Sequence, residues 1–514
     1  MIPEAQLISG PDATPSKAGF TTKVVKGSLW TLVGQVLPLG VALFTTPFVI
    51  RLLGAESYGV LVLIALIPTY LGFADLGMGI ASTRFGSDAY ASGDLKYEAR
   101  VLHTAALIAL LAAFPIAALL FFFSDLIVGS FNVPNTLLAE AGLALKIASV
   151  TFVINFLNNI FNTPQLARLR MDLNTLVTAG FRTAGIIATP VVIYLGGGVL
   201  GAVLVLLTAS VLTLAGHLIV SKRLLSSLFA TSLDQTMIRP LLKFGGALVI
   251  SSIAALLLGS AEKLIVARIT SPKELAYYSV AFTLAMVMTL FSGSMTQSLI
   301  PAFAQLQGPD DRARLNGLYA RCIRITLIVF LPAVVFFGMI AKSFLTLWAG
   351  PDFGREGAVP LYVILAGLLF NAVAYFPCAM ILASGRPDIL AKIYWLELLL
   401  YIPVVIFLVS RYGITGAAIA WSIRGTCDSL ILFVCAHRAT GVSAGSFDWQ
   451  VGLSAFLLIT TPFLLTLYYA EVNIVIAASA LIAFSLYGLI VWKRFLDREE
   501  TDWLRARIYG FFPG

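Results

Sequence analysis

The sequence predicts an all-α integral membrane protein of about fourteen transmembrane helices. Hydrophobic residues make up 59% of the 514 residues and charged residues only 12%, whereas a soluble globular domain has about 25% charged residues. The charges lie in short gaps between apolar runs, and these runs reach the roughly 20 residues that a helix needs to cross a bilayer. We therefore expect the apolar surface to face lipid and other helices of the same chain.

Fourteen apolar segments are long enough to be the spans. Their predicted positions are 27–50, 58–83, 101–123, 143–165, 173–195, 198–221, 244–268, 275–300, 322–347, 358–383, 388–409, 414–437, 450–468 and 472–492. Several contain proline, for example Pro38, Pro190 and Pro403. Inside a bundle, neighbouring groups satisfy the carbonyls that proline leaves free, so we expect kinked spans.

Lysine and arginine are distributed unequally between alternate loops. Most of the 34 basic residues fall on the side of the membrane that holds the N-terminus, and cytoplasmic loops carry such an excess. The sequence therefore predicts cytoplasmic tails at residues 1–26 and 494–514. Residues 1–26 lack the apolar core of a cleavable signal peptide, so we expect the first span to direct insertion.

The two halves of the chain repeat one another at an offset of about 213–217 residues. Five matches occur in the same order: Lys26 with Lys243, Arg51 with Arg268, 170–172 with 386–388, 190–195 with 403–408, and 198–202 with 413–417. Six spans separate equivalent points, and because six is even, both halves enter the membrane in the same orientation. A pseudo-two-fold axis along the membrane normal is expected, as in transporters that rock two bundles about a central site.

The repeat also predicts the domain organisation. Besides the two tails, the predicted domains are a first six-helix bundle at 27–222, a cytoplasmic linker at 223–243, a second six-helix bundle at 244–438, and two further helices at 439–493. The last two helices lie outside the repeat and extend a six-plus-six core.

Seven charged residues are predicted to lie at membrane depth, where each costs about 2.5–3.5 kcal/mol on insertion scales. They are Arg182, Lys263, Arg424, Glu397, Asp428, Asp75 and Glu262, three basic and four acidic. Because such residues need a functional or structural reason, we predict that they bind the transported substrate. Arg182 and Glu397 are equivalent under the repeat, so they would face one another across a central cavity or simply bridge the two bundles.

Structural roles are open for the other five. Arg424 and Asp428 are four residues apart on one helix face and would neutralise each other. Glu262 and Lys263 are adjacent, about 100° apart on a helix, so one of them must pair elsewhere or face water. Asp75 lies among glycines that permit close helix approach, where packing or capping is an alternative to substrate binding.

Metalloprotease and nucleotide-hydrolysing motifs are absent from the sequence. There is no HExxH or Walker A pattern. The four cysteines have no CxxC spacing, and the histidines are scattered: Cys322, Cys378, Cys427 and Cys435, and His103, His217 and His437. We therefore predict no catalytic residue, no metal and no cofactor. Without a P-loop the chain cannot hydrolyse ATP, so a coupling cation, Na⁺ or H⁺, or an existing gradient must drive transport.

Several motifs carry a family resemblance. Leu-Leu-Gly-Ala-Glu-Ser-Tyr-Gly at 52–59, Asp-Leu-Gly-Met-Gly at 75–79 and Arg84 lie in the first half, and 261–269, 276–281, 300–303, 308–312 and 344–348 lie in the second. Over residues 22–440 the sequence resembles the polysaccharide-export (oligosaccharidyl-lipid flippase) branch, O-antigen flippases included, of the multidrug/oligosaccharidyl-lipid/polysaccharide flippase superfamily.

The resemblance implies a transporter and not an enzyme. Its substrate would be a polyprenyl-diphosphate-linked oligosaccharide for surface polysaccharides such as lipopolysaccharide, flipped from the inner to the outer leaflet by alternating access. Arg182, Lys263 and Arg424 would meet the diphosphate. The implied location is a bacterial cytoplasmic (inner) membrane, and the implied partners are the lipid-linked glycan, the bilayer and other polysaccharide-assembly membrane proteins, with no nucleic acid.

Two other functions are considered beside this one. A cation-coupled multidrug antiporter of the same superfamily would use Asp75, Glu397 and Asp428 to bind cations, but that branch commonly stops at twelve helices. A membrane glycan polymerase or ligase would need a long external loop with catalytic arginine or histidine, which the sequence lacks.

Overall fold

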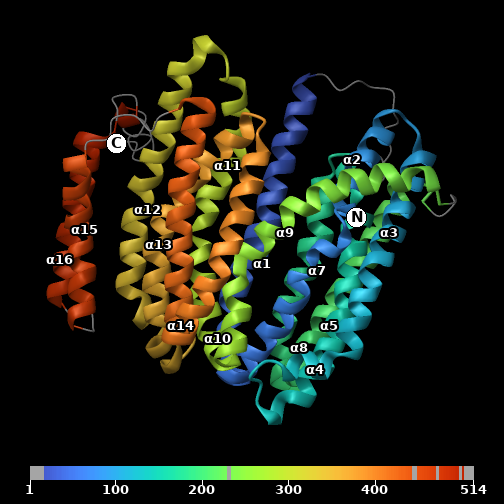
Figure 1. The fold of residues 1–514 in the computed structure, drawn as a ribbon, viewed down its shortest axis with the longest axis horizontal. Helices are drawn as coiled ribbons and strands as arrows, with labels where there is room; N and C mark the ends of the chain where they lie inside the picture. The colour runs from blue at the N-terminus through green and yellow to red at the C-terminus, as the bar shows by residue number, and fades with distance from the viewer. Residues whose placement is uncertain (1–16, 229–232, 443–448, 470–473, 497–499, 503–514) are drawn as a thin grey trace, which may run out of the picture. The chain divides into compact units, whose positions relative to one another are not determined.

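The computed structural model describes residues 17–228, 233–442, 449–469, 474–496 and 500–502 (Figure 1). All regular structure in these ranges is helical, without a β-strand. The predicted all-α membrane fold is therefore confirmed. Residues 1–16 and 503–514 of the two predicted tails lie outside the described residues, and α1 already begins at Lys17.

The chain forms two compact units. Unit 1 contains the described residues up to 260 together with 267–276, and unit 2 contains 261–266 and those from 277 onward. The helix that joins them, α9 (Ile238–Ile269), therefore contributes to both. The domain boundaries expected from the sequence stay predictions.

Unit 1 holds the first helices of the chain. These are α1 (Lys17–Tyr70), η2 (Gly72–Asp75), α2 (Met78–Ala91), α3 (Leu95–Phe122), α4 (Ser124–Gly129), α5 (Asn135–Phe161), α6 (Thr163–Ala167), α7 (Met171–Val192), η3 (Ile193–Gly197), α8 (Gly198–Leu224) and η4 (Gln235–Met237). Helix α1 packs against α5, α7 and α8, and α3 packs against α2 and α5. Small and aliphatic side chains such as Ala81, Val101 and Ala105 fill the contact between α2 and α3.

Unit 2 holds the remaining helices. They are α10 (Pro272–Val287), which starts in unit 1, α11 (Thr289–Gln305), η5 (Pro309–Asp311), α12 (Arg312–Trp348), α13 (Pro351–Ala383), α14 (Pro387–Thr440), α15 (Trp449–Tyr469), α16 (Ile474–Ile490) and η6 (Val491–Phe495). Helix α13 packs against α11, α12 and α14. The core between them contains Phe303, Tyr319, Phe376 and Met380, all at most 1% exposed.

Some apolar helices are too long for a single membrane crossing. Among the described residues, nine helical segments are long and apolar enough to cross a membrane. Three of them, Leu29–Asp75, Met171–Leu224 and Pro387–Thr440, have 47, 54 and 54 residues, although about 20 suffice for a bilayer. Each contains a glycine with a non-helical backbone: Gly54, Gly196 and Gly413. Each segment thus covers two predicted spans, and the total of fourteen stays a prediction.

The internal repeat is visible in the backbone conformation. Leu169 and Gly385, 216 positions apart, both adopt a left-handed conformation with φ of 55° and 74°. The backbone N–H of the residue that follows each one donates a hydrogen bond to the carbonyl five positions earlier. These bonds join Arg170 to the Gln165 carbonyl at 2.8 Å and Arg386 to the Ile381 carbonyl at 3.3 Å. The same helix ending therefore occurs at the same place in both halves.

A second pair of equivalent positions repeats a rarer conformation. Gly198 has φ 56° and ψ −153°, and Gly413, 215 positions later, has φ 56° and ψ −136°. Only glycine adopts this region readily. The sequence match between 198–202 and 413–417 thus reflects a shared backbone geometry.

Polar contacts join the linker to one end of unit 1. Ser227 Oγ donates a hydrogen bond to the Leu95 carbonyl at 2.9 Å, and Arg100 lies 3.6 Å from the Asp234 carboxylate. The hydroxyl and backbone N–H of Thr236 hydrogen-bond to Asp234 and lower the pKa of that carboxyl, with a smaller contribution from Arg100. All these segments are predicted to lie on the cytoplasmic side, so their contacts agree with the predicted alternation of loops.

The loops predicted on the other side of the membrane also contact one another within unit 1. Asn132 Nδ2 donates to the Thr270 carbonyl at 2.7 Å, and the Leu200 N–H donates to Glu140 Oε1 at 3.0 Å. Both contacts join loops predicted on the outer side. Within unit 1 the loops thus separate into two groups, although which group faces the cytoplasm stays a prediction.

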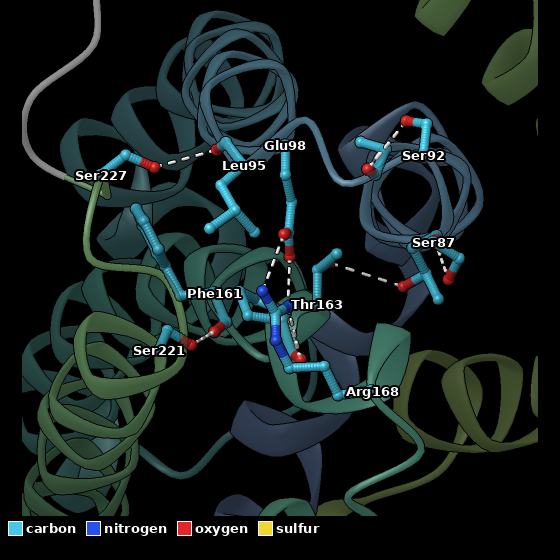
Figure 2. A network of polar contacts seen from close by, with 12 residues as sticks. Ser87, Ser92, Leu95, Glu98, Phe161, Thr163, Arg168, Ser221 and Ser227 are labelled. Carbon is cyan, nitrogen blue, oxygen red and sulfur yellow. Dashed lines mark hydrogen bonds and ion pairs between the residues drawn. The ribbon is translucent and has the colours of Figure 1, made fainter. Parts of the chain in front are cut away.

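A buried ion pair joins α3 to the loop after α6 at the linker end of unit 1 (Figure 2). The Arg168 guanidinium donates to both oxygens of Glu98, at 2.6 and 2.9 Å, and to the Pro164 carbonyl at 3.1 Å. The Glu98 side chain is fully buried and the Arg168 side chain is 9% exposed. Tyr90 covers the guanidinium at 4.4 Å from its ring centroid.

The two helices outside the repeat belong to unit 2. Helix α15 packs against α12 and α16 (Figure 1). The Tyr487 hydroxyl of α16 donates to the Ile328 carbonyl of α12 at 3.1 Å. Further along the chain, Glu500 receives hydrogen bonds from Arg321 at 2.6 Å and Arg324 at 3.1 Å. The additional helices are therefore attached to one unit through α12.

Candidate functional site

Unit 1 contains a cavity of about 690 Å³, within the 300–1,000 Å³ of typical small-molecule sites. It lies between the second half of α1 and helices α5, α7 and α8. Its apolar lining includes Leu61, Ile64 and Phe152. The polar lining residues are Thr69, Thr151, Asn155, Asn158, Asn159, Asn162, Asn174, Thr178, Arg182, Ser210, Thr213 and His217. A polar cavity inside an apolar helical unit is a candidate site for a hydrophilic substrate.

Four asparagines at the end of α5 lie on one face of the helix. Asn155, Asn158, Asn159 and Asn162 follow the spacing i, i+3, i+4, i+7, which places all four side chains along one stripe. Asn155 and Asn159 are exposed, whereas Asn158 is buried and donates to the Ser210 carbonyl at 3.3 Å. The stripe therefore supplies an uncharged polar wall to the cavity.

Arg182 supplies the charge in this cavity. It lies on α7, its side chain is exposed, and it forms no ion pair or hydrogen bond with the residues that the structure describes. His217, by contrast, is 1% exposed and both of its ring nitrogens are used. They contact Gln165 at 3.0 Å and the Thr178 hydroxyl at 3.1 Å. His217 thus orders the cavity wall, while Arg182 is available to an anionic ligand.

A separate group of charges lies in unit 2 on the two halves of α14. Glu397 and Asp428 are each 7% exposed, and Arg424 Nη1 lies 3.5 Å from Glu397 Oε2. This separation is longer than the 2.7–2.9 Å of a good charge-assisted hydrogen bond. Both Glu397 oxygens, Asp428 Oδ1 and Arg424 Nε lack a hydrogen-bond partner in the described parts of the chain. The cluster therefore retains unused buried acceptors.

The ion pair of Arg424 differs from the one that helical spacing favours. Arg424 and Asp428 are four residues apart, yet among the described residues the ion pair joins Arg424 to Glu397. The non-helical backbone at Gly413 divides α14 into two halves, and this brings Glu397 of the first half to Arg424 of the second.

Glu262 and Lys263 have separate surroundings. Glu262 is fully buried and accepts hydrogen bonds from the hydroxyls of Tyr278 at 3.3 Å and Tyr401 at 3.1 Å. Lys263 Nζ lies 4.2 Å from the ring centroid of Phe282. Of this adjacent pair, the glutamate is thus held by tyrosines and the lysine by a cation–π contact.

Asp75 has a local structural role in unit 1. Its Oδ1 accepts a hydrogen bond from the Gly77 N–H at 2.8 Å, just before α2 begins at Met78. Gly77, with φ 72°, meets Gly245 so closely that a Cβ on Gly77 would lie 2.8 Å from the Gly245 carbonyl oxygen. Asp75 therefore holds the turn that leads into α2, and this is a local packing role.

The predicted site residues thus fall into two groups. In unit 1, Arg182 lines the cavity and Asp75 holds the turn before α2. The other five, Glu262, Lys263, Glu397, Arg424 and Asp428, lie in unit 2. No set of three or more His, Cys, Asp or Glu side chains in the described ranges converges as metal ligands would. The facing of Arg182 and Glu397 across a cavity stays a prediction.

Comparison with known proteins identifies the family. A family model described as polysaccharide biosynthesis protein matches residues 24–307, more than half of the chain. The chain belongs to the polysaccharide biosynthesis protein family. The resemblance inferred from its motifs is therefore confirmed.

A relative in this family covers most of the chain. A Shigella flexneri protein named as a candidate O-antigen transporter is 23% identical over 417 residues, which are 80% of this chain and 96% of the relative. The match extends past residue 307 and so includes much of unit 2.

Solved structures show that this family shares its fold with two groups of transporters. The lipid II flippase MurJ in an inward closed conformation has a TM-score of 0.65 at 16% identity, covering 91% of this chain and 98% of MurJ. An inward-facing multidrug resistance MATE transporter of the MOP superfamily also has a TM-score of 0.65 at 16% identity, covering 82% and 100%. The chain therefore has the fold of this superfamily.

The structure reveals two features of this polysaccharide biosynthesis family member that its charged residues alone do not predict. One is the asparagine stripe on α5, which the spacing of four asparagines within residues 155–162 could have revealed. The other is the buried pair of Glu98 and Arg168, which lie 70 positions apart. No local sequence pattern marks that pair, because both residues lie in segments predicted as solvated loops or their edges.

Proposed function

We propose that this protein flips a polyprenyl-diphosphate-linked oligosaccharide from the inner to the outer leaflet of a bacterial cytoplasmic membrane for surface polysaccharide biosynthesis. The observation that carries the proposal is the polar cavity of unit 1, with its asparagine stripe and with Arg182, which pairs with none of the described residues. Family membership and the transporter folds of both solved structures support transport over enzymatic activity. The Shigella flexneri relative, by its name, handles O-antigen.

The physical requirement for such a cavity follows from the substrate. Sugar hydroxyls and a diphosphate lose their hydrogen bonds if they enter hydrocarbon without partners. The cavity would provide these partners, with Arg182 meeting the diphosphate. The polyprenyl tail would stay in lipid, because each methylene moved into water costs about 0.8 kcal/mol.

The cluster in unit 2 is proposed to couple transport to a cation gradient. Glu397 and Asp428 bury carboxylate oxygens without hydrogen-bond partners in the described residues, and Glu262 lies nearby through Tyr401, whose ring is 5.4 Å from the Arg424 guanidinium. Binding of Na⁺ or H⁺ would satisfy these oxygens. Other polysaccharide-assembly membrane proteins are proposed partners that would supply and remove the lipid-linked glycan.

A cation-coupled multidrug antiporter is the second candidate. It is favoured by the MATE structure, whose TM-score equals that of MurJ. The share of this chain that each structure matches favours the flippase instead, because MurJ covers 91% of the chain and the MATE structure 82%. Helices α15 and α16, which the repeat does not explain, account for a difference of this size.

Deletion of the gene in its host tests the proposal. We expect loss of surface glycan and accumulation of lipid-linked glycan in the inner leaflet, with both restored by the wild-type chain. Normal surface glycan combined with increased drug sensitivity would favour the antiporter instead.

A further inference from the structure

We propose that the asparagine stripe of α5 is a sugar-binding subsite that recognises the glycan separately from the diphosphate. The inference rests on the proposed function and deepens it, because it assigns the uncharged polar wall of the cavity to sugar hydroxyls. Its key residues are Asn155 and Asn159, with Asn162 and Asn174 beside them.

The side chains of the stripe differ in what they contact. Asn158 is 7% exposed, and its amide nitrogen donates to the Ser210 carbonyl at 3.3 Å and to Asn155 Oδ1 at 3.4 Å. Asn158 therefore holds Asn155 in place and ties α5 to α8. Asn155 and Asn159 are exposed in the cavity, so their amide groups are accessible to a ligand.

Unsatisfied buried oxygens point to a missing polar partner. Oδ1 of Asn158, Asn162 and Asn174 is buried without a hydrogen-bond partner in the described parts of the chain. All three residues line the same cavity. An unsatisfied buried polar group destabilises a protein, so a hydrogen-bond donor brought to these oxygens by a ligand would be stabilising.

The internal repeat shows that the fold itself does not require these asparagines. The offset of 216 that relates the helix endings at Leu169 and Gly385 relates residues 155, 158, 159 and 162 to Asn371, Ala374, Tyr375 and Cys378. Ala374 is 4% exposed and belongs to the apolar core of unit 2. The equivalent helix face thus packs with a single asparagine, so the other three in unit 1 call for a functional reason.

The chemistry of the stripe matches sugars and not phosphates. A carboxamide both donates and accepts hydrogen bonds, as does a pair of neighbouring sugar hydroxyls. An anionic diphosphate only accepts, and Arg182 on α7 provides the cation for it in the same cavity. The stripe would therefore bind the sugar of the headgroup, and Arg182 would bind its diphosphate.

Equilibrium binding to the full-length protein in lipid nanodiscs tests this division. The two probes are the lipid-linked glycan extracted from the host membrane and undecaprenyl diphosphate without sugar. We expect wild-type protein to prefer the glycan-bearing probe. The double substitution Asn155→Ala with Asn159→Ala should weaken binding of that probe roughly tenfold, which corresponds to about 1.4 kcal/mol, because it removes the hydrogen bonds of two side chains. Binding of undecaprenyl diphosphate should stay within twofold of wild type.

The matched control is Asn135→Ala, which removes an exposed asparagine at the start of the same helix outside the cavity. It should leave both affinities unchanged. Should the double variant fail to fold, Asn159→Ala alone is measured, with a severalfold loss expected. Equal weakening for both probes, or none, in a folded variant would overturn the sugar subsite while leaving the proposed function intact. A wild-type protein that binds both probes equally would likewise overturn the sugar subsite alone, whereas one that binds neither probe would overturn both proposals.

Discussion

Arg168 holds the buried carboxylate of Glu98 through two hydrogen bonds of 2.6 and 2.9 Å, across 70 positions of sequence. The planar guanidinium fork fits a carboxylate in this two-point geometry, which lysine cannot reproduce. With α2, α3 and α6 meeting around it, the pair fixes the linker end of unit 1 (Figure 2).

The first prediction concerns this ion pair. Glu98→Gln leaves the Arg168 charge buried without its partner, so we expect a loss of about 3–5 kcal/mol in the free energy of unfolding. The measurement is thermal or denaturant unfolding of purified protein in detergent. Asp352→Asn, which breaks an exposed pair with Arg355, is the control and should cost at most about 1 kcal/mol.

A double substitution separates the charge effect from simple loss of packing. Glu98→Leu combined with Arg168→Met replaces both partners by apolar groups and should recover most of the lost stability. If Glu98→Gln unfolds at the same temperature as wild type, the pair does not stabilise unit 1.

The second prediction uses the equivalent glycines of the repeat. Gly198→Ala and Gly413→Ala each place a side chain in a backbone region that glycine alone adopts readily, so each should destabilise the protein by about 1–3 kcal/mol. Gly180→Ala is the control, because a Cβ there meets no atom within 4 Å and its φ is not positive. Similar stability of all three variants would argue against a shared strained turn.

The third prediction concerns orientation. Reporter fusions that are active only in the periplasm should be silent at the N-terminus, at the linker near Ser227 and at the C-terminus, since basic residues concentrate on that side. Contacts of Ser227 with Leu95 and of Glu500 with Arg321 group these segments with loops of the same predicted side. Periplasmic activity at the linker alone would show that the first six spans are miscounted.

The fourth prediction concerns coupling. Glu397→Gln and Asp428→Asn should abolish stimulation of transport by a Na⁺ or H⁺ gradient, while binding of the lipid-linked glycan is retained. Asp388→Asn on the same helix, in an exposed pair with Lys392, should keep the stimulation. Gradient-driven transport by both acidic variants at the wild-type rate would remove the cluster from coupling.

The fold could be predicted from the sequence because it depends on patterns that extend over many residues. Apolar runs define helices, and two matching halves define a repeat that the backbone at Leu169 and Gly385 reproduces. Which charged residues pair, by contrast, depends on where a turn brings two distant segments of the chain together. Arg424 meets Glu397 and not Asp428 because the backbone departs from helical geometry at Gly413, and no i, i+4 rule contains that information.

The candidate site was only partly predictable for a different reason. Burial of a charged residue in a membrane is costly, so the sequence alone marks Arg182 as a candidate site residue. The asparagines of the cavity carry no charge, and their role emerges only when Asn155 and Asn159 are seen to line the same space as Arg182. A search for polar as well as charged stripes on apolar helices would have found them.

The most direct test is flipping of the host's lipid-linked glycan in proteoliposomes, measured as its exposure to a membrane-impermeant glycan-modifying enzyme. Wild-type protein should expose glycan from the inner leaflet well above protein-free liposomes. Arg182→Ala should be at least about tenfold slower, because a charge-assisted contact contributes about 1.5–3 kcal/mol, and Arg182→Lys should recover part of the rate. No exposure above protein-free liposomes, or an unchanged rate for Arg182→Ala, would contradict a headgroup site in this cavity.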